Sequence, residues 1–275
     1  MTDLLIHSMA EFADLILRTL DLTQARTIAE IGAEYGSMSH QLANHCQTHN
    51  GTLIAIDPAP APEFLTWAAT QPHVRHIASP SLEVIADLEN IDAWLIDGDH
   101  NYYTVLHELR LADTVCRRDD RPLLAIMHDV AWPWARRDLY YTPQRIPPEH
   151  RHAHSYDAGV ILDSADAQRH RGFRGNGQFA VALRAGGPCN GVLTAIEDFR
   201  SEAEQDAGQV GRQLLYAHVP AVFGLGVLFD AAAPWAQQLA EALVPWHDNP
   251  LLAKLETNRL RNYLAVLDWQ DGFRR

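Results

Sequence analysis

The stretch AEIGAEYGS, residues 29–37, joins the end of an apolar run to the start of a helical pattern. Gly32 and Gly36 permit a tight turn and the close approach of a ligand to the backbone. A helix beginning just beyond would offer unpaired N–H groups to a carboxylate or phosphate. The dinucleotide fingerprint GxGxxG is excluded, because Glu34 and Ser37 stand where it needs glycine. The stretch therefore predicts a strand, a ligand-binding turn and a helix, in that order.

The same alternation of short apolar runs and helical patterns continues to residue 130. It is typical of a parallel sheet covered by helices on both faces, so we predict an α/β fold with a doubly wound, mostly parallel sheet. The expected strands are Thr27–Ile31, Thr52–Ile56, Val74–Ala78, Ala93–Ile96 and Leu123–Met127, and the expected helices are Met38–His49, Pro62–Thr70, Leu82–Leu88 and Tyr102–Val115.

After Met127 this alternation breaks, and residues 131–190 are rich in Trp, Arg, Pro, His and Gly. Later, two extended runs around a Pro/Gly turn predict an antiparallel hairpin that completes the sheet. In the insertion only Gly159–Leu162 and Phe179–Leu183 resemble strands; beyond it we expect a helix at Val192–Ala203 and hairpin strands at Gln213–His218 and Leu225–Phe229. The predicted organisation is an N-terminal helix (1–22), a cofactor-binding core (23–130), an insertion or lid (131–190), completion of the core sheet (191–232) and a two-helix tail (233–275).

Composition excludes several classes of function. The 275 residues are 47% apolar and 21% charged, as in an ordinary globular protein, and the net charge of −13 argues against a nucleic-acid surface. The three cysteines form no CxxC pair, which indicates a reducing compartment. Neither a targeting segment nor an apolar run long enough to span a membrane is evident. We therefore expect a cytoplasmic protein without a membrane or nucleic-acid partner, and homo-oligomerisation stays open.

A carboxylate follows the second expected strand, at Asp57 in the run IAIDP. An acid in this place commonly accepts hydrogen bonds from ribose hydroxyls. Glycine turns and strand-end acids each occur in many α/β proteins, but their order here favours a cofactor that carries a nucleoside.

Four motifs of this sequence resemble those of class I S-adenosylmethionine-dependent methyltransferases: EIGAEYGS, AIDP, LIDGDHNYYTV and MHDV. The nearest likeness is to macrocin-type sugar O-methyltransferases and, more remotely, to catechol and caffeoyl-CoA O-methyltransferases. It covers residues 25–130 well and 191–230 loosely, and it implies a seven-stranded Rossmann-like methyltransferase fold. Glu34 replaces a frequent glycine, so we expect a wider turn with Glu34 facing solvent. The resemblance assigns S-adenosylmethionine binding to Glu30, Gly32, Gly36, Asp57, Ser81 and Asp97, with Asp57 on the ribose and Ser81 near the adenine.

Acidic and imidazole side chains follow the fourth and fifth expected strands, in DGDH (97–100) and HD (128–129). The carboxyl ends of adjacent parallel strands meet where α/β proteins bind ligands, so Asp97, Asp99 and Asp129 could converge. Hard oxygen donors of this kind suit Mg²⁺.

The resemblance to catechol-type enzymes implies that Asp97 and Asp129 bind magnesium and that His100 is the general base. The third ligand of those relatives directly follows the fifth-strand aspartate, and here that residue is Val130. Asp99 or His128 could replace it, so metal-assisted and protein-only catalysis both remain open. A histidine side chain, which ordinarily titrates near neutral pH, is well suited to take a proton from a hydroxyl group.

The insertion leaves the fifth strand beside Asp129, so its first residues are expected over the pocket mouth. Aromatic rings offer flat walls and arginine grips anionic or hydroxyl-rich groups, although a cover that only excludes water is an equal alternative. The predicted acceptor contacts are Trp132, Trp134, Arg136, Arg137 and Tyr140.

Alternating histidines at 150, 152 and 154 would share one face of a strand and could bind a transition metal. The prolines at 147 and 148 make a solvated loop at least as plausible.

Taken together, the sequence predicts an S-adenosylmethionine-dependent O-methyltransferase acting on a small polar or sugar-bearing metabolite, such as one of secondary metabolism. Two alternatives stay open. One is a metal-independent methyltransferase that uses His100 alone and could act on nitrogen, and the other is a cofactor-binding protein whose lid recognises a partner.

Overall fold

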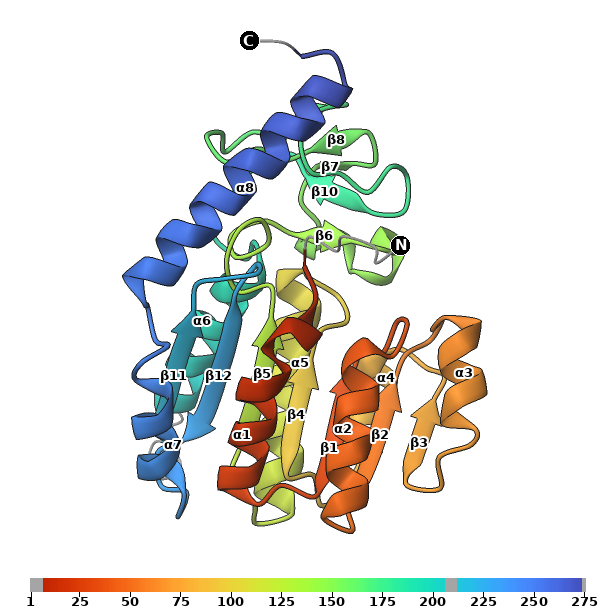
Figure 1. Ribbon diagram of the computed structural model, residues 1–275, viewed down its shortest axis with the longest axis vertical. Coiled ribbons are helices and arrows are strands. Elements are labelled where there is room, and N and C mark those ends of the chain that lie inside the picture. The colour runs from red at the N-terminus through yellow and green to blue at the C-terminus, as the bar shows by residue number, and fades with distance from the viewer. Residues whose placement is uncertain (1–6, 206–211, 274–275) are drawn as a thin grey trace.

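The computed structural model of the chain describes residues 7–205 and 212–273. Its centre is a seven-stranded sheet in the order β11-β12-β5-β4-β1-β2-β3 (Figure 1). The five strands from the first half pair in parallel, and the β11–β12 hairpin adds antiparallel to β5. The predicted fold class is therefore confirmed. The strands are β1 (Thr27–Ile31), β2 (Thr52–Ile56), β3 (Val74–Ile77), β4 (Ala93–Ile96), β5 (Leu124–His128), β11 (Leu214–Val219) and β12 (Leu225–Asp230).

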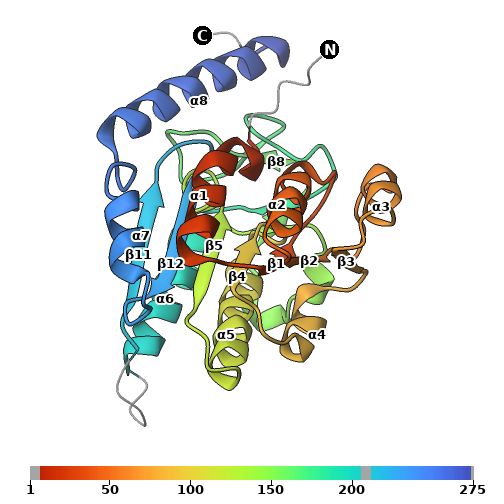
Figure 2. The same cartoon turned by 60° about the horizontal axis from the view of Figure 1, so that its bottom comes forward.

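Helices cover both faces of the sheet, and each face has its own apolar core (Figure 2). Strands β4 and β5 are buried along their whole length, which explains why they read as continuous apolar runs. One face carries α1 (Ala13–Thr23), α2 (Ser37–Thr48), α3 (Pro62–Ala68) and α7 (Ala236–Leu243); the other carries α4 (Ser81–Val84), α5 (Tyr102–Arg118) and α6 (Val192–Gln205).

The N-terminal segment was expected to be helical from residue 1 to 22. The structure begins this segment with a 3-10 turn at Met9–Phe12, capped by the Ser8 hydroxyl, and continues into α1. Residues 1–6 of the expected helix lie outside the described residues.

The insertion is more regular than the sequence suggested. It forms a three-stranded sheet in the order β6-β10-β7 and a two-stranded pair β8-β9. These strands are only two or three residues long, too short to give an alternating pattern in the sequence. Their bounds are β6 (Leu139–Tyr140), β7 (His154–Ser155), β8 (Ala158–Gly159), β9 (Gln168–Arg169) and β10 (Ala180–Ala182).

The buried Asp138 carboxylate fastens the insertion to the core. One oxygen accepts N–H groups from Tyr102 and Gly191, at 2.8 and 2.7 Å, and the other accepts the Tyr140 hydroxyl at 2.7 Å. Since Tyr102 begins α5 and Gly191 precedes α6, this one side chain joins the insertion to the helices before and after it.

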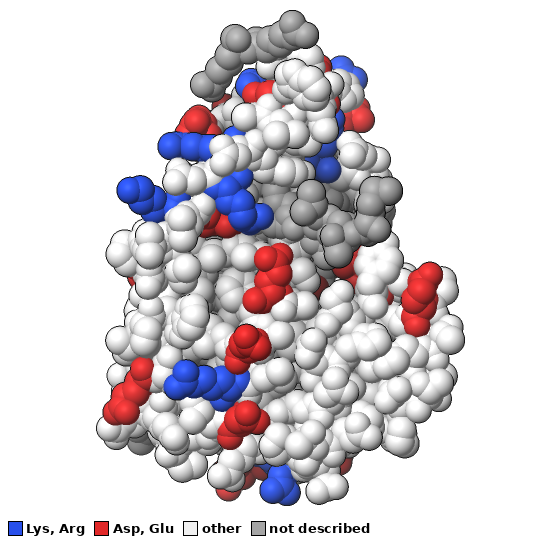
Figure 3. Space-filling model, viewed as in Figure 1, with Lys and Arg blue, Asp and Glu red and all other residues white. Residues whose placement is uncertain are grey.

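The tail consists of α7 and α8 (Pro250–Gln270), and α8 extends along the insertion strands in Figure 1. Two bidentate ion pairs join the insertion to the end of this helix. Arg171 binds Asp268 at 2.7–2.8 Å, and Arg174 binds Asp271 at 2.6–2.8 Å. Most basic side chains visible in Figure 3 lie in its upper part, over α8 and the insertion. In the described part of the chain, no helix combines the length and hydropathy needed to cross a membrane.

Candidate active site

The glycine turn after β1 packs directly against the loop after β4. A Cβ added to Gly32 would lie 2.2 Å from the Asp97 carbonyl oxygen and 2.8 Å from the Gly98 Cα. The φ of Gly32 is also +89°, which side-chain-bearing residues rarely adopt. Gly32 therefore makes room for the neighbouring loop as well as permitting the turn. Gly36, with φ +84°, caps α2.

Asp57 lies at the end of β2, as expected, and its carboxylate holds the glycine turn in place. Its Oδ2 accepts the N–H groups of Ala33 and Glu34, both at 2.9 Å, and its Oδ1 accepts that of Ala59 at 2.8 Å. Glu34 is exposed with φ +47°, in agreement with its expected place in the turn. A cofactor ribose bound to Asp57 would share carboxylate oxygens that already accept hydrogen bonds from backbone amides.

Glu30 is a buried carboxyl on β1, and it accepts the Ser39 hydroxyl of α2 at 2.6 Å. Burial raises its pKa to about 8, although the Ser39 hydrogen bond works in the opposite direction. The side chain is therefore largely protonated at neutral pH, and a cationic ligand group beside it would drive off that proton.

Ser81 begins α4, and its hydroxyl donates to the buried Glu108 carboxyl of α5. Burial raises the pKa of Glu108 to about 8. The residue expected near adenine thus has an internal partner, and its hydroxyl proton is committed to Glu108.

Four side chains from β4 and β5 converge at the carboxyl edge of the sheet. The Nδ1 of His100 lies 3.0 Å from Asp129 Oδ2, and the Nδ1 of His128 lies 3.3 Å from Asp97 Oδ1 and 3.7 Å from Asp129 Oδ2. His100, His128 and Asp129 are buried, and Asp97 is partly exposed. Of the three aspartates expected to converge from the parallel strands, Asp97 and Asp129 do so, together with His100, whereas Asp99 is not part of the same group.

The contacts of His128 favour its cationic form. Its Nε2 contacts the Val222 carbonyl oxygen at 2.8 Å, so this nitrogen must carry a proton, while Nδ1 faces the two carboxylates. Burial alone would lower the pKa of His128, but Asp97 and Asp129 outweigh it and raise the pKa to about 9.

Asp97, His100 and Asp129 each place one ligand atom within 4.8 Å of the others, so this group could hold a metal ion, but it lacks the third oxygen ligand of a catechol-type magnesium site. Val130, in the position of the third ligand, is fully buried and offers no ligand atom. The protonated Nδ1 of His128 faces both carboxylates, and its charge would oppose a divalent ion there. Asp129 Oδ1 is buried without a hydrogen-bond partner among the described residues, and such an atom suits a donor group on a ligand.

Two residues beside this cluster were not assigned to the site from the sequence. The ring of Tyr141, from the insertion, lies 6.1 Å from that of His100, and the Tyr141 side chain is 48% exposed. His7 stacks on Phe223 at 4.6 Å and on His128 at 6.5 Å. Desolvation lowers the pKa of His7. Tyr141 lies one residue beyond the predicted contacts, whereas nothing local in the sequence distinguishes His7.

The predicted acceptor contacts divide into two sets. Trp134, Arg137 and Tyr140 are at most 2% exposed, and Arg137 donates to the Ala165 and Ala182 carbonyls. Burial therefore favours a structural role in the insertion for these three residues over the expected contact with the acceptor. Trp132 and Arg136 line a surface cavity of about 460 Å³ together with residues 160–165. Arg136 also binds Glu197 of α6 at 2.6–2.7 Å.

The histidines at 150, 152 and 154 do not form a metal cluster among the described residues. His152 Nε2 contacts the Cys189 carbonyl at 2.8 Å, and His154 Nδ1 contacts the His152 carbonyl at 2.8 Å. His150 instead stacks on Tyr103. His150 ends a 3-10 turn and His154 begins β7, so the three histidines do not share one face of a strand.

Residues 29–129 match the family model described as a methyltransferase domain. The matched segment runs from β1 to Asp129 and so contains the glycine turn, Asp57 and the convergent cluster. This match confirms the predicted enzyme class, an S-adenosylmethionine-dependent methyltransferase. No curated protein matches the sequence.

Solved structures of methyltransferases are similar to this chain at low identity. One from Staphylococcus aureus, assigned as a caffeoyl-CoA O-methyltransferase, is 13% identical with a TM-score of 0.45, over 80% of this chain and 83% of that one. A methyltransferase from Podospora anserina with bound S-adenosylhomocysteine is 12% identical, with a TM-score of 0.44, over 78% and 76%. The Burkholderia thailandensis 1,6-didemethyltoxoflavin-N1-methyltransferase is 13% identical, with a TM-score of 0.43, over 80% and 76%. These likenesses decide neither substrate nor mechanism.

Proposed function

We propose that this protein transfers a methyl group from S-adenosylmethionine to a hydroxyl oxygen of a small polar or sugar-bearing acceptor, with His100 as the general base. The observation that carries the proposal is the 3.0 Å approach of His100 Nδ1 to the buried Asp129 carboxylate. A carboxylate in this place orients the imidazole with Nδ1 inward and Nε2 outward, where Nε2 can take a proton from an acceptor. The sequence resemblance to macrocin-type O-methyltransferases points to the same class of acceptor.

The residues at the carboxyl edge suit the polar groups of S-adenosylmethionine. This molecule supplies a methyl carbon activated by its positive sulfur, and it also bears an ammonium, a carboxylate and a ribose. Glu30, with its raised pKa, is suited to the ammonium, and the glycine turn and Asp57 to the amino acid and ribose parts.

In the proposed reaction His100 Nε2 removes the acceptor's hydroxyl proton as the oxygen forms a bond to the methyl carbon. The carbon–sulfur bond breaks with its electron pair on sulfur, which becomes a neutral thioether. The imidazolium that results is stabilised by Asp129. Proton transfer of this kind contributes about 10²–10⁴-fold, and alignment of the oxygen with the methyl group contributes the larger share.

A mass-shift screen of metabolite acceptors with methyl-labelled S-adenosylmethionine tests the proposal. The expected result is one acceptor class that gains a labelled methyl group on oxygen, at a rate that His100→Ala lowers strongly while cofactor affinity is kept. Transfer of the labelled methyl group to a nitrogen atom of the acceptor would favour the alternative that acts on nitrogen. Cofactor binding without transfer to any acceptor would favour the binding-protein alternative.

Chelation separates the protein-only reaction from a magnesium-assisted one. Because Val130 and His128 do not suit magnesium, chelator is expected to leave the rate unchanged. Loss of activity that Mg²⁺ restores, and that Asp129→Ala abolishes, would instead require a metal on Asp97 and Asp129.

In the proposed site, the insertion contacts the acceptor through Tyr141 and not through the buried Trp134, Arg137 and Tyr140. Tyr141→Ala should raise the KM for the acceptor with little change in cofactor affinity. Tyr156→Ala, a partly exposed tyrosine elsewhere in the insertion, is the matched control. Equal kinetic effects of the two variants would remove Tyr141 from the site.

A further inference from the structure

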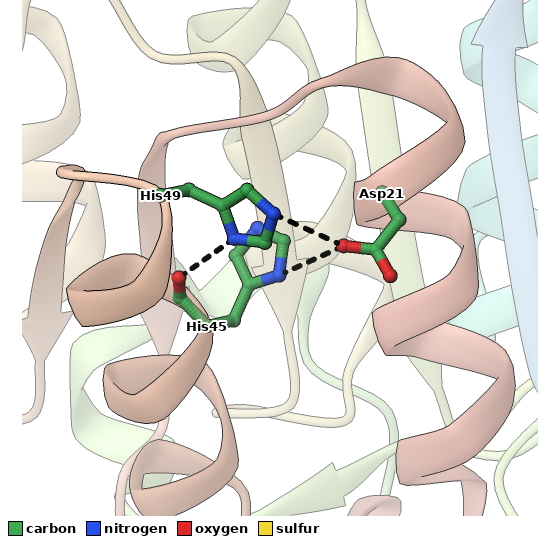
Figure 4. A group of neighbouring side chains, drawn as sticks. All are labelled: Asp21, His45 and His49. Atoms are coloured by element: carbon green, nitrogen blue, oxygen red, sulfur yellow. Dashed lines mark hydrogen bonds and ion pairs between the residues drawn. The ribbon is translucent and has the colours of Figure 1, made fainter.

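A second cluster of histidine and aspartate lies at the edge of the sheet opposite to the proposed active site. Asp21 is in the last turn of α1, His45 is in the last turn of α2, and His49 directly follows α2 (Figure 4). The turn from α1 into β1 lies beside it, since Ala25 contacts His45. None of these residues takes part in the proposed reaction.

Backbone contacts fix which nitrogen of each imidazole carries the proton. His45 Nε2 lies 2.9 Å from the Ala25 carbonyl oxygen, and His49 Nδ1 lies 2.9 Å from the His45 carbonyl oxygen. A carbonyl only accepts, so both of these nitrogens must be donors. The remaining nitrogens, His45 Nδ1 and His49 Nε2, both face the same oxygen of Asp21.

Three acceptor atoms therefore converge when both imidazoles are neutral, and nothing among them donates. Such an arrangement is repulsive unless a cation lies between the three atoms. Metal-binding histidines characteristically give their outer N–H to a backbone carbonyl, which orients the inner lone pair toward the metal.

The spacing agrees with one metal ion. His45 Nδ1 and His49 Nε2 lie 3.4 and 3.6 Å from Asp21 Oδ1, and one ligand atom from each residue lies within 4.8 Å of the others. Ligands at about 2.0–2.1 Å from a tetrahedral Zn²⁺ stand about 3.3–3.4 Å apart. Small side-chain adjustments would complete that geometry.

The fourth position opens to solvent. Asp21, His49, Gln24 and Arg26 line a surface cavity of about 460 Å³. His45 is buried, with a side-chain exposure of 4%, while the side chains of His49 and Asp21 are 41% and 59% exposed. An ion could enter from the cavity, and water could complete its shell.

We propose that Asp21, His45 and His49 form a binding site for a divalent transition metal of the Zn²⁺ class, separate from the active site. Two imidazoles and one carboxylate are the donor set that Zn²⁺ takes with three protein ligands. The bound ion joins the end of α1 to the end of α2, so it stabilises the folded chain rather than the reaction.

Calorimetric titration of chelator-treated, buffer-exchanged protein with Zn²⁺ alone tests the site. The expected result is one equivalent bound and a higher melting temperature. His49→Ala and Asp21→Asn change partly exposed side chains, so both variants should fold, and each should weaken Zn²⁺ binding at least about tenfold. His150→Ala, an exposed histidine of the insertion, is the matched control and should bind as the wild type does.

Co²⁺ provides a second readout, since its visible bands are intense when it has four ligands including nitrogen. These bands should appear in the wild type and in His150→Ala and be lost in His49→Ala. Failure to bind one equivalent of Zn²⁺ would overturn the proposal and leave a proton as the cation between the three atoms. Equal affinity in wild type, His49→Ala and Asp21→Asn would also overturn it, because the ion would then bind elsewhere.

Discussion

The two histidine–aspartate clusters lie at opposite edges of one sheet and differ in their share of carboxylates. At the carboxyl edge two imidazoles meet two carboxylates, and His128 faces both of them, the buried Asp129 and the partly exposed Asp97. At the other edge two imidazoles face one carboxylate that is more than half exposed. In both clusters, a backbone carbonyl oxygen lies within hydrogen-bonding distance of the imidazole nitrogen that points away from the carboxylate.

This difference decides which cation suits each cluster. With two anions beside it, one buried imidazole retains its proton, and the pKa of His128 rises to about 9. With one anion for two imidazoles, protonating both would place two cations against a single carboxylate. A divalent ion satisfies all three acceptors there at once. The larger share of carboxylates, together with burial, therefore favours a proton on His128, whereas the single carboxylate of the other cluster leaves two imidazoles open to a metal ion.

The largest expected effect concerns the rate of reaction. His100→Ala removes the proposed base and should lower kcat by about 10²–10⁴-fold with the acceptor found in the screen. His49→Ala should leave kcat unchanged, because it lies at the other edge of the sheet. Initial rates with methyl-labelled cofactor measure both. If His49→Ala were as slow as His100→Ala, the two clusters would not be functionally separate.

Replacing one histidine in each cluster should lower the free energy of unfolding by different amounts. His128→Gln leaves the buried Asp129 carboxylate without its cation, which should cost roughly 3–5 kcal/mol in the free energy of unfolding. His45→Gln, compared in metal-free buffer, loses about one hydrogen bond, worth about 1 kcal/mol. Urea denaturation at pH 7 measures the loss of stability in both variants. Similar losses would contradict the charge ratio as the deciding factor.

The pH dependence of stability should report His128. Its pKa is about 9 in the folded protein against an ordinary 6.5, so its contribution is complete below pH 6.5 and is lost as pH rises through 9. The contribution amounts to about 3 kcal/mol. Glu30 and Glu108 have pKa values raised to about 8 from an ordinary 4.5. Their contribution to stability is therefore also lost as pH rises, starting near pH 4.5.

Urea denaturation in steps from pH 6 to 9.5 would show this fall, and His128→Gln should make it shallower. Glu108→Gln is the comparison for the carboxyl part of the slope. Stability that rises over this range in the wild type would contradict the protonated state of His128.

The smallest expected effect is the response to chelation. At a Zn²⁺ concentration ten times the dissociation constant, the metal contributes about 1.4 kcal/mol. Its removal should lower the melting temperature by about 3–5 °C, with kcat unchanged. Differential scanning calorimetry with and without chelator measures the shift, and His49→Ala should show none. A fall in kcat in step with the melting temperature would place the metal in the reaction.

The parts of the molecule that follow from local pattern could be predicted from the sequence. Strands β1, β2, β4 and β12 read as apolar runs, and the glycine turn reads as a break between strand and helix. The approach of His100 to Asp129 follows from parallel strands that end at one edge.

What depended on distant packing could not be predicted. Nothing local distinguishes the buried Arg137 from the more exposed Arg136, because Arg137's partners are carbonyls 28 and 45 residues away. The Val222 carbonyl that fixes the His128 proton is 94 residues away. The pair of His45 and His49 has helical spacing, but Asp21 joins it only through the packing of α1 on α2.

The ion pairs from Arg171 and Arg174 to the last helix make the insertion and α8 a single exchangeable module. Their partners, Asp268 and Asp271, lie almost a hundred residues further along the chain, so a graft of residues 131–190 into another methyltransferase would leave both arginines without carboxylates. A chimera that also carries residues 250–273 keeps both pairs. Replacing the insertion in a redesign of this scaffold would therefore require the transfer of two segments, residues 131–190 and residues 250–273.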